Sequence, residues 1–524
     1  MSESSTEFLI GVDVGTGSVR AALVDTTGVI RKISVQSIKM WSPKPDFFEQ
    51  SSDDIWDACR KVIKEVKEGI PPNAIKGLGF DATCSLVVLD NKGKPVSVNL
   101  EGQTSQNVIM WLDHRASKQA DFINSTEDPI LKFVGGKVSL EMEVPKLLWL
   151  KENMKQKCWD VADKFFDLPD FLTWKATGCD SRSLCSLVCK WLYEVTPDGQ
   201  HRWNKHFYQK IGLGELLDEN ARKIGSVVKA PGEPCGKGLS KEAAEDLGLI
   251  EGTAVATSII DAHAGGIGLV GCDAFSITQD FTKRISLICG TSTCHMVVNK
   301  KAIFVNGVWG PYYSAMVPGF WLNEAGQSAT GKLVDHIIDS HPASVVIKKK
   351  LFGGDTHVTD YLNNLLDEIS TSKGIPFDQL TEDIHVWPDF HGNRSPIADP
   401  TLKGMICGLS LAVGEEHLAL LYLATIQSLA YGTRHIIEVL MAEGYGDIEC
   451  ILACGGLSKN RMFVQTQANS VSKPVLIPQQ VESVLLGSAV LAATCANIYP
   501  DVQSAVKKMA GSAEPVYPDL KVKR

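Results

Sequence analysis

Two glycine-rich turns of the same design, one near the front of each half of the chain, constrain the fold more than any other feature. The first lies in Phe8–Asp25, which reads FLIGVDVGTGSVRAALVD, and the second lies in Ile285–Asn299, which reads ISLICGTSTCHMVVN. In both, apolar runs flank a Gly-Thr turn, a pattern typical of a β-hairpin. Such a turn can offer backbone N–H groups and hydroxyls to a phosphate. The repetition indicates two duplicated domains that each present a turn to one side of a polyphosphate.

The first turn carries a carboxylate just before its glycines. Asp13 could hold Mg²⁺ through water at this position, although an ordinary hairpin with a surface aspartate fits the same residues. The turn is not a P-loop, because it lacks the Gly-x4-Gly-Lys-Ser/Thr pattern. It is not a dinucleotide fingerprint either, because no helix is expected directly after the glycines.

The length and charge of the chain limit the number of domains and the kinds of partner that are expected. A chain of 524 residues is too long for one core and predicts two or more domains. Its 44% hydrophobic and 22% charged residues are typical of a globular protein, and its net charge of −9 argues against binding to nucleic acid or anionic membranes. Met1–Glu7 does not resemble a secretory signal, and the longest apolar region, Leu418–Tyr431, is too short to span a bilayer. A cytoplasmic location is therefore expected.

The 14 cysteines do not form a metal-binding or disulfide pattern along the sequence. Cys185/Cys189 and Cys450/Cys454 are each spaced by three residues, without a matching second pair or a pair of histidines nearby. We interpret them as buried thiols in a reducing compartment.

One aspartate follows an apolar strand and precedes a run of small residues. The segment Ala256–Gly268 reads ATSIIDAHAGGIG, and Val255–Ile260 has strand character. The small residues after Asp261 would let a ligand or another backbone approach closely. From these residues alone Asp261 is either the N-cap of the next helix or a catalytic base that faces a crevice.

Three further polar sites lie inside or beside apolar runs. The segment Asp81–Ser85 is a turn at a binding crevice or a structural loop. Trp111, beside Asp113 and Arg115, could line a polyol site or be a core residue next to a surface ion pair. Lys190 either points into a site or extends its ammonium outward from an apolar segment.

The second half of the chain contains a long expected helix, a polar segment around Glu324 and a pair of glycines after an apolar strand. Glu415–Glu443 is expected to be one long amphipathic helix, whereas Gly225–Gly252 in the first half is expected to be a long connection. Trp321–Lys332 brings Glu324, Gln327 and Gly331 close together in sequence. In Ile448–Asn460 a strand runs into Gly455-Gly456 and a helix, where a purine could lie on flat backbone with the helix N-terminus near phosphate.

The succession of these segments resembles the FGGY carbohydrate kinases from about Phe8 to about Ala496, and within that family it is most similar to the ribulokinases, in particular the D-ribulokinase branch of animals and fungi. The segments that carry the resemblance are GTGS, FDATCS, MWLDHRA, SLVCKW, DAHAG, CGTST, EAGQSATG, FHGNRSP and CGGLSKN. It implies an α/β fold of two ribonuclease-H-like domains, as in actin, hexokinase and Hsp70, with ATP and sugar in the cleft between them. The expected domains are 8–268 for the sugar and the catalytic base, 280–500 for ATP, and a tail at 501–524.

The resemblance also assigns roles to individual residues. It makes Asp261 the catalytic base. The residues expected to contact the sugar are Ala82, Thr83, Trp111, Lys190, Asp261 and Glu324. The residues expected to contact ATP are Thr16, Gly17, Gly290, Thr291, Gly331, Gly455, Gly456 and Asn460, with Asp13 on Mg²⁺.

Two departures from the family pattern bear on the expected substrate and on the C-terminal end of the chain. Glycerol kinases carry an Arg-Glu pair where this chain has Thr83-Cys84, which argues against glycerol. Relatives usually continue into a Tyr-rich helix where this chain stops at Lys521–Arg524, which would fit a shorter isoform or a trimmed chain.

The expected reaction is transfer of phosphate from ATP to the terminal C5 hydroxyl of a pentulose, with D-ribulose first and L-ribulose, xylulose or ribitol as alternatives. A noncatalytic sugar or nucleotide sensor on the same fold is the alternative from another class. The sequence is compatible with a homodimer.

Overall fold

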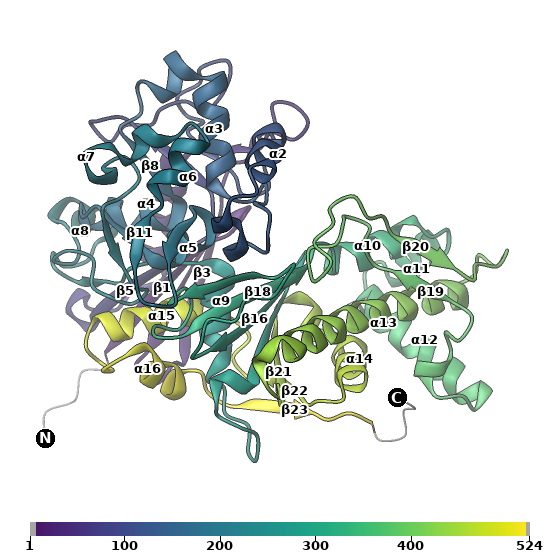
Figure 1. Ribbon diagram of the computed structural model, residues 1–524. Coiled ribbons are helices and arrows are strands. Elements are labelled where there is room, and N and C mark those ends of the chain that lie inside the picture. The colour runs from purple at the N-terminus through teal and green to yellow at the C-terminus, as the bar shows by residue number, and fades with distance from the viewer. Residues whose placement is uncertain (1–6, 520–524) are drawn as a thin grey trace, which may run out of the picture.

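Each half of the chain builds one mixed β-sheet, and the two sheets form the centres of two lobes in this computed structural model, which describes residues 7–519 (Figure 1). The first sheet has the order β13-β5-β1-β2-β3, with β14 also paired to β5. Its strands are β1 Phe8–Val14, β2 Ser18–Asp25, β3 Ile30–Ser37, β5 Ile75–Ala82, β13 Ala254–Val255 and β14 Ile259–Ile260. The expected hairpin is confirmed, because β1 and β2 are antiparallel around the Gly15–Gly17 turn.

The register of the first sheet brings three aspartates to one edge. Strands β1 and β5 are parallel, with Asp13 opposite Asp81, and β14 is parallel to β5, with Ile260 opposite Ala82. Because the carboxyl ends of parallel strands meet at the same edge of a sheet, Asp261, which directly follows β14, lies at the same edge as Asp13 and Asp81.

The second sheet repeats this arrangement. Its order is β17-β18-β16-β15-β21-β22-β23, with β15 antiparallel to β16 and parallel to β21, as β1 is to β2 and β5. The strands are β15 Arg284–Cys289, β16 Thr293–Asn299, β17 Trp309–Tyr313, β18 Trp321–Gln327, β21 Cys450–Cys454, β22 Val475–Pro478 and β23 Ala513–Val516. The second expected hairpin, around Gly290–Ser292, is therefore also confirmed.

Two helices cross between the sheets. Helix α9 (Asp261–Val270) packs against β15 of the second sheet, whereas α15 (Ser483–Cys495) packs against β1 and β5 of the first (Figure 1). The crossing requires glycine, because a Cβ on Gly487 would lie 1.9 Å from the carbonyl oxygen of Ala264 and one on Gly268 would lie 2.0 Å from that of Ser483. Each crossing helix therefore packs against the sheet of the other half, and the domain boundaries at 268 and 280 stay predictions.

The first lobe carries a second, four-stranded sheet of order β4-β7-β6-β8 and several short elements. Its further strands are β4 Glu49–Gln50, β6 Leu86–Leu89, β7 Val108–Ile109, β8 Lys164–Asp167, β9 Ser181–Ser183, β10 Tyr193–Val195, β11 His201–Trp203 and β12 Val227–Lys229. Its helices are α1 Ser52–Val66, α2 Ser117–Ser125, α3 Glu143–Asn153, α4 Leu168–Thr177, α5 Leu184–Lys190, α6 Lys205–Lys210, α7 Asp218–Ala221 and α8 Lys241–Leu247. The long connection expected over Gly225–Gly252 contains two short elements that were not expected, β12 and α8.

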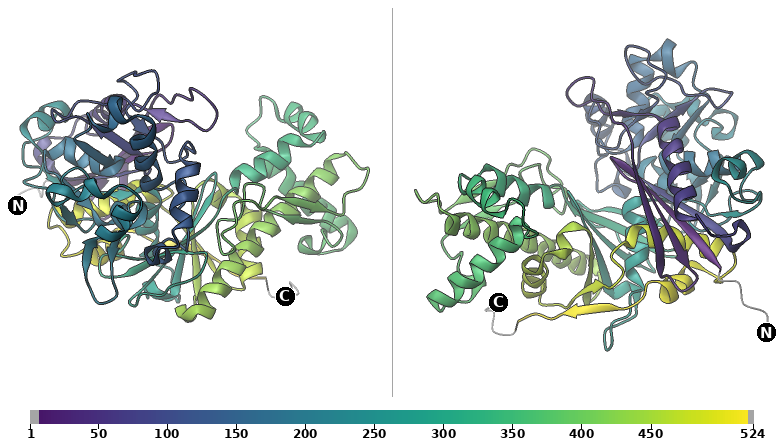
Figure 2. Two further views of the ribbon diagram at one scale, coloured as in Figure 1. Left: turned by 45° about the horizontal axis from the view of Figure 1, so that its top comes forward. Right: turned by 180° about the vertical axis from the view of Figure 1, so that it is seen from behind.

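The second lobe is mainly helical outside its sheet. The expected long helix is confirmed as α13, Glu415–Leu440. The other elements of this lobe are α10 Gly331–Ser340, α11 Ala343–Leu351, α12 Val358–Lys373, α14 Arg461–Val471 and the two-stranded ribbon β19 His385–Trp387 with β20 Met405–Cys407. Helix α16 (Val502–Met509) packs against α15 and lies below the first lobe (Figure 1). From behind, the chain after α16 runs beneath the first lobe to β23 at the edge of the second sheet (Figure 2).

Residues 520–524 of the predicted tail lie outside the described residues. Between residues 7 and 519, no helix has the length and apolar character that crossing a membrane requires.

Candidate active site

The three aspartates at the edge of the first sheet have different surroundings. Asp13 is buried and its Oδ2 accepts hydrogen bonds from Nε (2.8 Å) and a terminal nitrogen (2.5 Å) of Arg20. The other terminal nitrogen of Arg20 donates to Glu482 at 2.6 Å. Since Glu482 immediately precedes α15, this arginine ties the first hairpin to the helix that crosses between the sheets.

Asp81 lies fully buried beside Asp13. Ser488 donates to its Oδ2 at 2.5 Å, and its Oδ1 accepts no hydrogen bond from any described residue. Burial first, and then the charge of Asp13, raise the pKa of Asp81 well above its ordinary value.

Asp261 is half-buried and begins α9. Ile260, not Asp261, occupies the N-cap position, and Asp261 Oδ1 accepts the backbone N–H of Ala262 at 2.7 Å. Oδ2 has no protein partner in the described chain. Burial, followed by the negative charge of Asp13, raises the pKa of Asp261 to about 7. A carboxylate that exchanges its proton near neutral pH has the property required of a general base.

A buried cluster of charged side chains joins the two lobes. Lys190 is the last residue of α5. Its Nζ lies 3.9 Å from the carboxylate of Glu141 and 4.7 Å from the centre of the Trp309 ring. Glu324 of β18 accepts a hydrogen bond from Arg394, whose guanidinium carbon lies 4.2 Å from the same ring centre. Lys190 from the first half and Glu324 from the second therefore share one site, as expected for groups that bind one ligand.

The charges of this cluster support one another. Burial would lower the pKa of Lys190, but attraction to Cys84, Glu324 and Glu141 outweighs it and the pKa is raised. Burial would raise the pKa of Glu324, but Arg394 and then Lys190 outweigh it and the pKa is lowered. Both side chains are consequently ionised, with a carboxylate and an ammonium available to sugar hydroxyls.

Trp111 connects the predicted sugar residues to the first glycine turn. Its indole N–H donates to Thr16 Oγ1 at 3.1 Å, and its backbone N–H donates to Ser85, whose hydroxyl lies 3.3 Å from that of Thr83. Ala82 ends β5 and is completely buried. These hydrogen bonds link the segment after β5 to the first glycine turn.

The ion pair beside Trp111 does not reach toward a ligand. Arg115 is buried and donates to Asp113 at 2.8 Å and to Glu49 at 2.9 Å. Neither a surface pair nor a pair that contacts a polyol is therefore correct for these two residues, which instead hold β4 and the segment after β7 together.

The second glycine turn meets two other glycine positions. The backbone N–H of Gly331, at the start of α10, donates to the carbonyl of Gly290 at 3.2 Å, and that of Thr330 donates to Thr291 at 2.9 Å. A Cβ on Gly331 would lie 2.6 Å from Gly290 O, and one on Gly455 would lie 2.4 Å from Cys289 O, where Gly455 also has φ +93°. These predicted nucleotide residues thus lie together, and only glycine allows the contacts.

The exposed glycines fit a polyphosphate. A Cβ added to Gly17 or to Gly456 would meet no atom within 4 Å, so each leaves bare backbone open on its turn. The open backbone N–H groups of these turns suit phosphate oxygens, and the Asp13 carboxylate suits Mg²⁺.

Asn460 has a different environment from the glycines. It is buried, its Oδ1 caps α14 by accepting the N–H of Met462 at 3.0 Å, and its amide donates to Tyr422 at 2.6 Å. Its side chain is thus used within the protein, and a contact with nucleotide stays a prediction.

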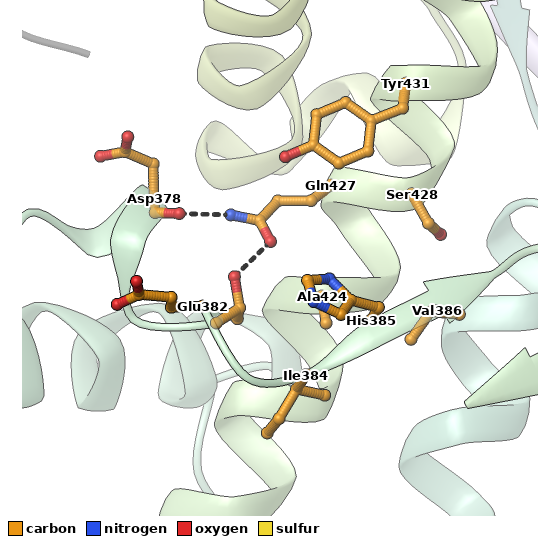
Figure 3. A pocket seen from close by; sticks show the side chains of 10 residues that line it. Asp378, Glu382, Ile384, His385, Val386, Ala424, Gln427, Ser428 and Tyr431 are labelled. Atoms are coloured by element: carbon orange, nitrogen blue, oxygen red, sulfur yellow. Dashed lines mark hydrogen bonds between the residues drawn. The ribbon is translucent and has the colours of Figure 1, made fainter. Parts of the chain in front are cut away.

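Three residues of the site were not expected to belong to it from the sequence: Arg20, His263, which lies 3.6 Å from Glu324, and Arg394. Asp81 was expected in a turn at a crevice or in a structural loop, whereas it lies within β5, opposite Asp13 of β1. Arg394 lay in a Pro/Gly-rich segment whose position depends on the tertiary fold. A cavity of about 230 Å³ between α13 and residues 378–386 contains none of the site residues (Figure 3).

Comparison with known protein families identifies both halves of the chain. Residues 8–268 match the N-terminal domain of the FGGY family of carbohydrate kinases and residues 285–496 match its C-terminal domain. The chain belongs to the FGGY family of carbohydrate kinases. This FGGY kinase is 53% identical to the human FGGY carbohydrate kinase domain-containing protein, over 99% of this chain and 94% of that protein.

Two other relatives of the FGGY kinase are informative. It is 38% identical to a D-ribulokinase of Saccharomyces cerevisiae, over 94% of this chain and 73% of that protein. Its fold is similar to that of a xylulose kinase from Lactobacillus acidophilus, with a TM-score of 0.78 at 18% identity, covering 98% of this chain and 94% of that one. The two-domain, actin- and hexokinase-like architecture expected from the sequence is therefore confirmed.

Proposed function

We propose that this FGGY kinase transfers phosphate from ATP to the terminal C5 hydroxyl of a pentulose, foremost D-ribulose, to give D-ribulose 5-phosphate. The observation that carries the proposal is Asp261, a half-buried carboxylate with a pKa of about 7 between the two lobes. The similarity to a D-ribulokinase along 94% of the chain supports the choice of sugar.

Asp261 is the catalytic base in this proposal. Its Oδ1 is fixed by the N–H of Ala262, so Oδ2 remains to accept the proton of the sugar hydroxyl as that oxygen attacks the γ-phosphorus. The start of α9 holds the carboxylate in place, because the helix is clamped between the β15 sheet and α15. Orientation of this kind is the main contribution that a kinase makes.

The two turns stabilise the charge on the phosphates. Backbone N–H groups and hydroxyls at Thr16, Gly17 and Thr291 bind equatorial oxygens, and the flat backbone at Gly331, Gly455 and Gly456 receives the nucleotide. When bound, Mg²⁺ neutralises phosphate charge, and Asp13 is the carboxylate placed to hold it, directly or through water.

The sugar is bound by groups from both lobes. Lys190 donates to and Glu324 accepts from its hydroxyls, while Trp111 packs on its C–H face and Ala82 and Thr83 line the end of β5. A buried partner left unpaired by the wrong epimer costs about 1–3 kcal/mol, which gives the site a means of selecting one pentulose.

A noncatalytic sensor is the competing function. Asp13, Asp261 and both glycine turns are all present in this chain, and a sensor has no need of a base with a pKa near neutral.

A substrate panel tests the proposed function. We expect ADP release with Mg-ATP to depend on sugar and kcat/KM to be roughly 5- to 150-fold higher for D-ribulose than for L-ribulose, D-xylulose or ribitol, since one unpaired buried group changes the barrier by about 1–3 kcal/mol. A higher kcat/KM for another sugar of the panel would change the proposed substrate but would leave the proposed kinase reaction unchanged. Absence of sugar-dependent turnover with every sugar would favour the sensor.

A further inference from the structure

A second set of ligand atoms lies directly behind Glu324. The thiols of Cys185 and Cys189 and a ring nitrogen of His263 lie within 4.8 Å of one another, and all three side chains are buried. Cys185 and Cys189 are four residues apart on α5 and therefore lie on one face of that helix. His263 comes from the first turn of α9, 74 residues after Cys189, which is why the cysteine spacing alone did not indicate a site.

The separations match the edges of a tetrahedral metal site. With Zn–S of about 2.3 Å and Zn–N and Zn–O of about 2.0–2.2 Å, ligand atoms in a tetrahedron lie about 3.6 Å apart for S and N and about 3.4 Å apart for N and O. Cys189 Sγ lies 3.5 Å from His263 Nε2, and the sulfur of Cys185 lies within 4.8 Å of both residues' ligand atoms. No large rearrangement is needed to bring these three atoms around one cation.

The three ligands are donor types that Zn²⁺ prefers. Two thiols and one imidazole make up the group, which does not include Glu324, although Glu324 Oε2 lies 3.6 Å from His263 Nε2. A zinc site with three protein ligands leaves its fourth position to water.

The charge balance also favours a dication. Binding would release one proton from each thiol to solvent, so that two thiolates and the His263 imidazole surround the metal, with no change of oxidation state. Lys190 and Arg394 lie nearby and oppose a positive ion, but Glu141 and Glu324 already pair with them.

We propose that Cys185, Cys189 and His263 form a binding site for one thiophilic divalent cation such as Zn²⁺, with the fourth position left to water.

Cobalt titration of the whole protein tests the site without an activity assay. Chelator-treated, reduced protein is titrated with Co²⁺ and then with Zn²⁺. We expect one Co²⁺ per chain, with thiolate-to-cobalt charge-transfer absorbance and the strong visible bands of four-coordinate cobalt, and loss of both when Zn²⁺ displaces it. Absence of charge-transfer absorbance in the wild type would overturn the proposal without recourse to any variant.

Single variants identify the ligands. Cys185→Ser and Cys189→Ser are each expected to weaken binding by roughly tenfold or more, as changes at metal sites do. The matched control is Cys407→Ser, because Cys407 is an exposed free thiol on β20 and its loss should leave the titration unchanged. Unchanged binding in both α5 variants, or loss in the control, would contradict the assignment.

Discussion

The Asp261→Asn variant is expected to lose about 10²- to 10⁴-fold in kcat, the usual contribution of a general base, while it still binds Mg-ATP and sugar. Asparagine has the same shape and can keep the bond from the N–H of Ala262, but it cannot take a proton from the sugar hydroxyl. Steady-state kinetics with D-ribulose and nucleotide binding by calorimetry measure the two effects separately.

A surface carboxylate serves as the matched control for this variant. Asp57→Asn removes an exposed partner of Arg60 on α1, a pair of the kind that contributes little, and should leave kcat unchanged. Near-normal turnover in Asp261→Asn would remove this residue from the role of base. Loss of Mg-ATP binding in the same variant would indicate a part in nucleotide binding instead.

Replacing Glu324 with alanine is expected to raise the KM for sugar by roughly 5- to 150-fold, which corresponds to about 1–3 kcal/mol for a buried hydrogen bond that is lost. The change in kcat should be smaller, because the side chain binds the sugar in the ground state as well as in the transition state. An unchanged KM would place Glu324 outside the sugar site.

Arg394 provides a test of how Glu324 is held. Arg394→Met removes the hydrogen bond to Oε1, and we expect the effects of the two substitutions on KM to be far from additive, because the residues act as one unit. Glu438→Ala, which removes the exposed partner of Arg434 on α13, is the control and should leave the KM unaltered. Additive effects of Glu324→Ala and Arg394→Met would show that the two side chains act independently.

Local sequence patterns were sufficient to predict the elements that carry the site. Both hairpins form around the expected Gly-Thr turns, because alternating apolar residues and glycine at a tight turn are local properties of the chain. The helix expected at Glu415–Glu443 was right to within three residues at its end. The strand before Asp261 was also predicted, although Ile260 takes the capping position.

Tertiary contacts decided what the sequence could not show. Arg394 and His263 join the site only because β18, α9 and the loop before β20 meet in the folded chain. A buried Arg115 likewise needs both Asp113 and Glu49, which is 66 residues away. Helix α8 was not predicted, although the sequence contains its capping residues, Ser240 at the start and Gly248 at the end. In the structure Gly248 has φ +67°.

The pH dependence of kcat/KM for the sugar, measured at saturating Mg-ATP, tests most directly whether Asp261 is the base. Its pKa is raised to about 7, so the carboxylate is ionised above that pH and protonated below it. The account predicts a kcat/KM that falls about tenfold per unit as the pH drops below about 7 and is level above it. A profile that stays flat through this range would contradict it.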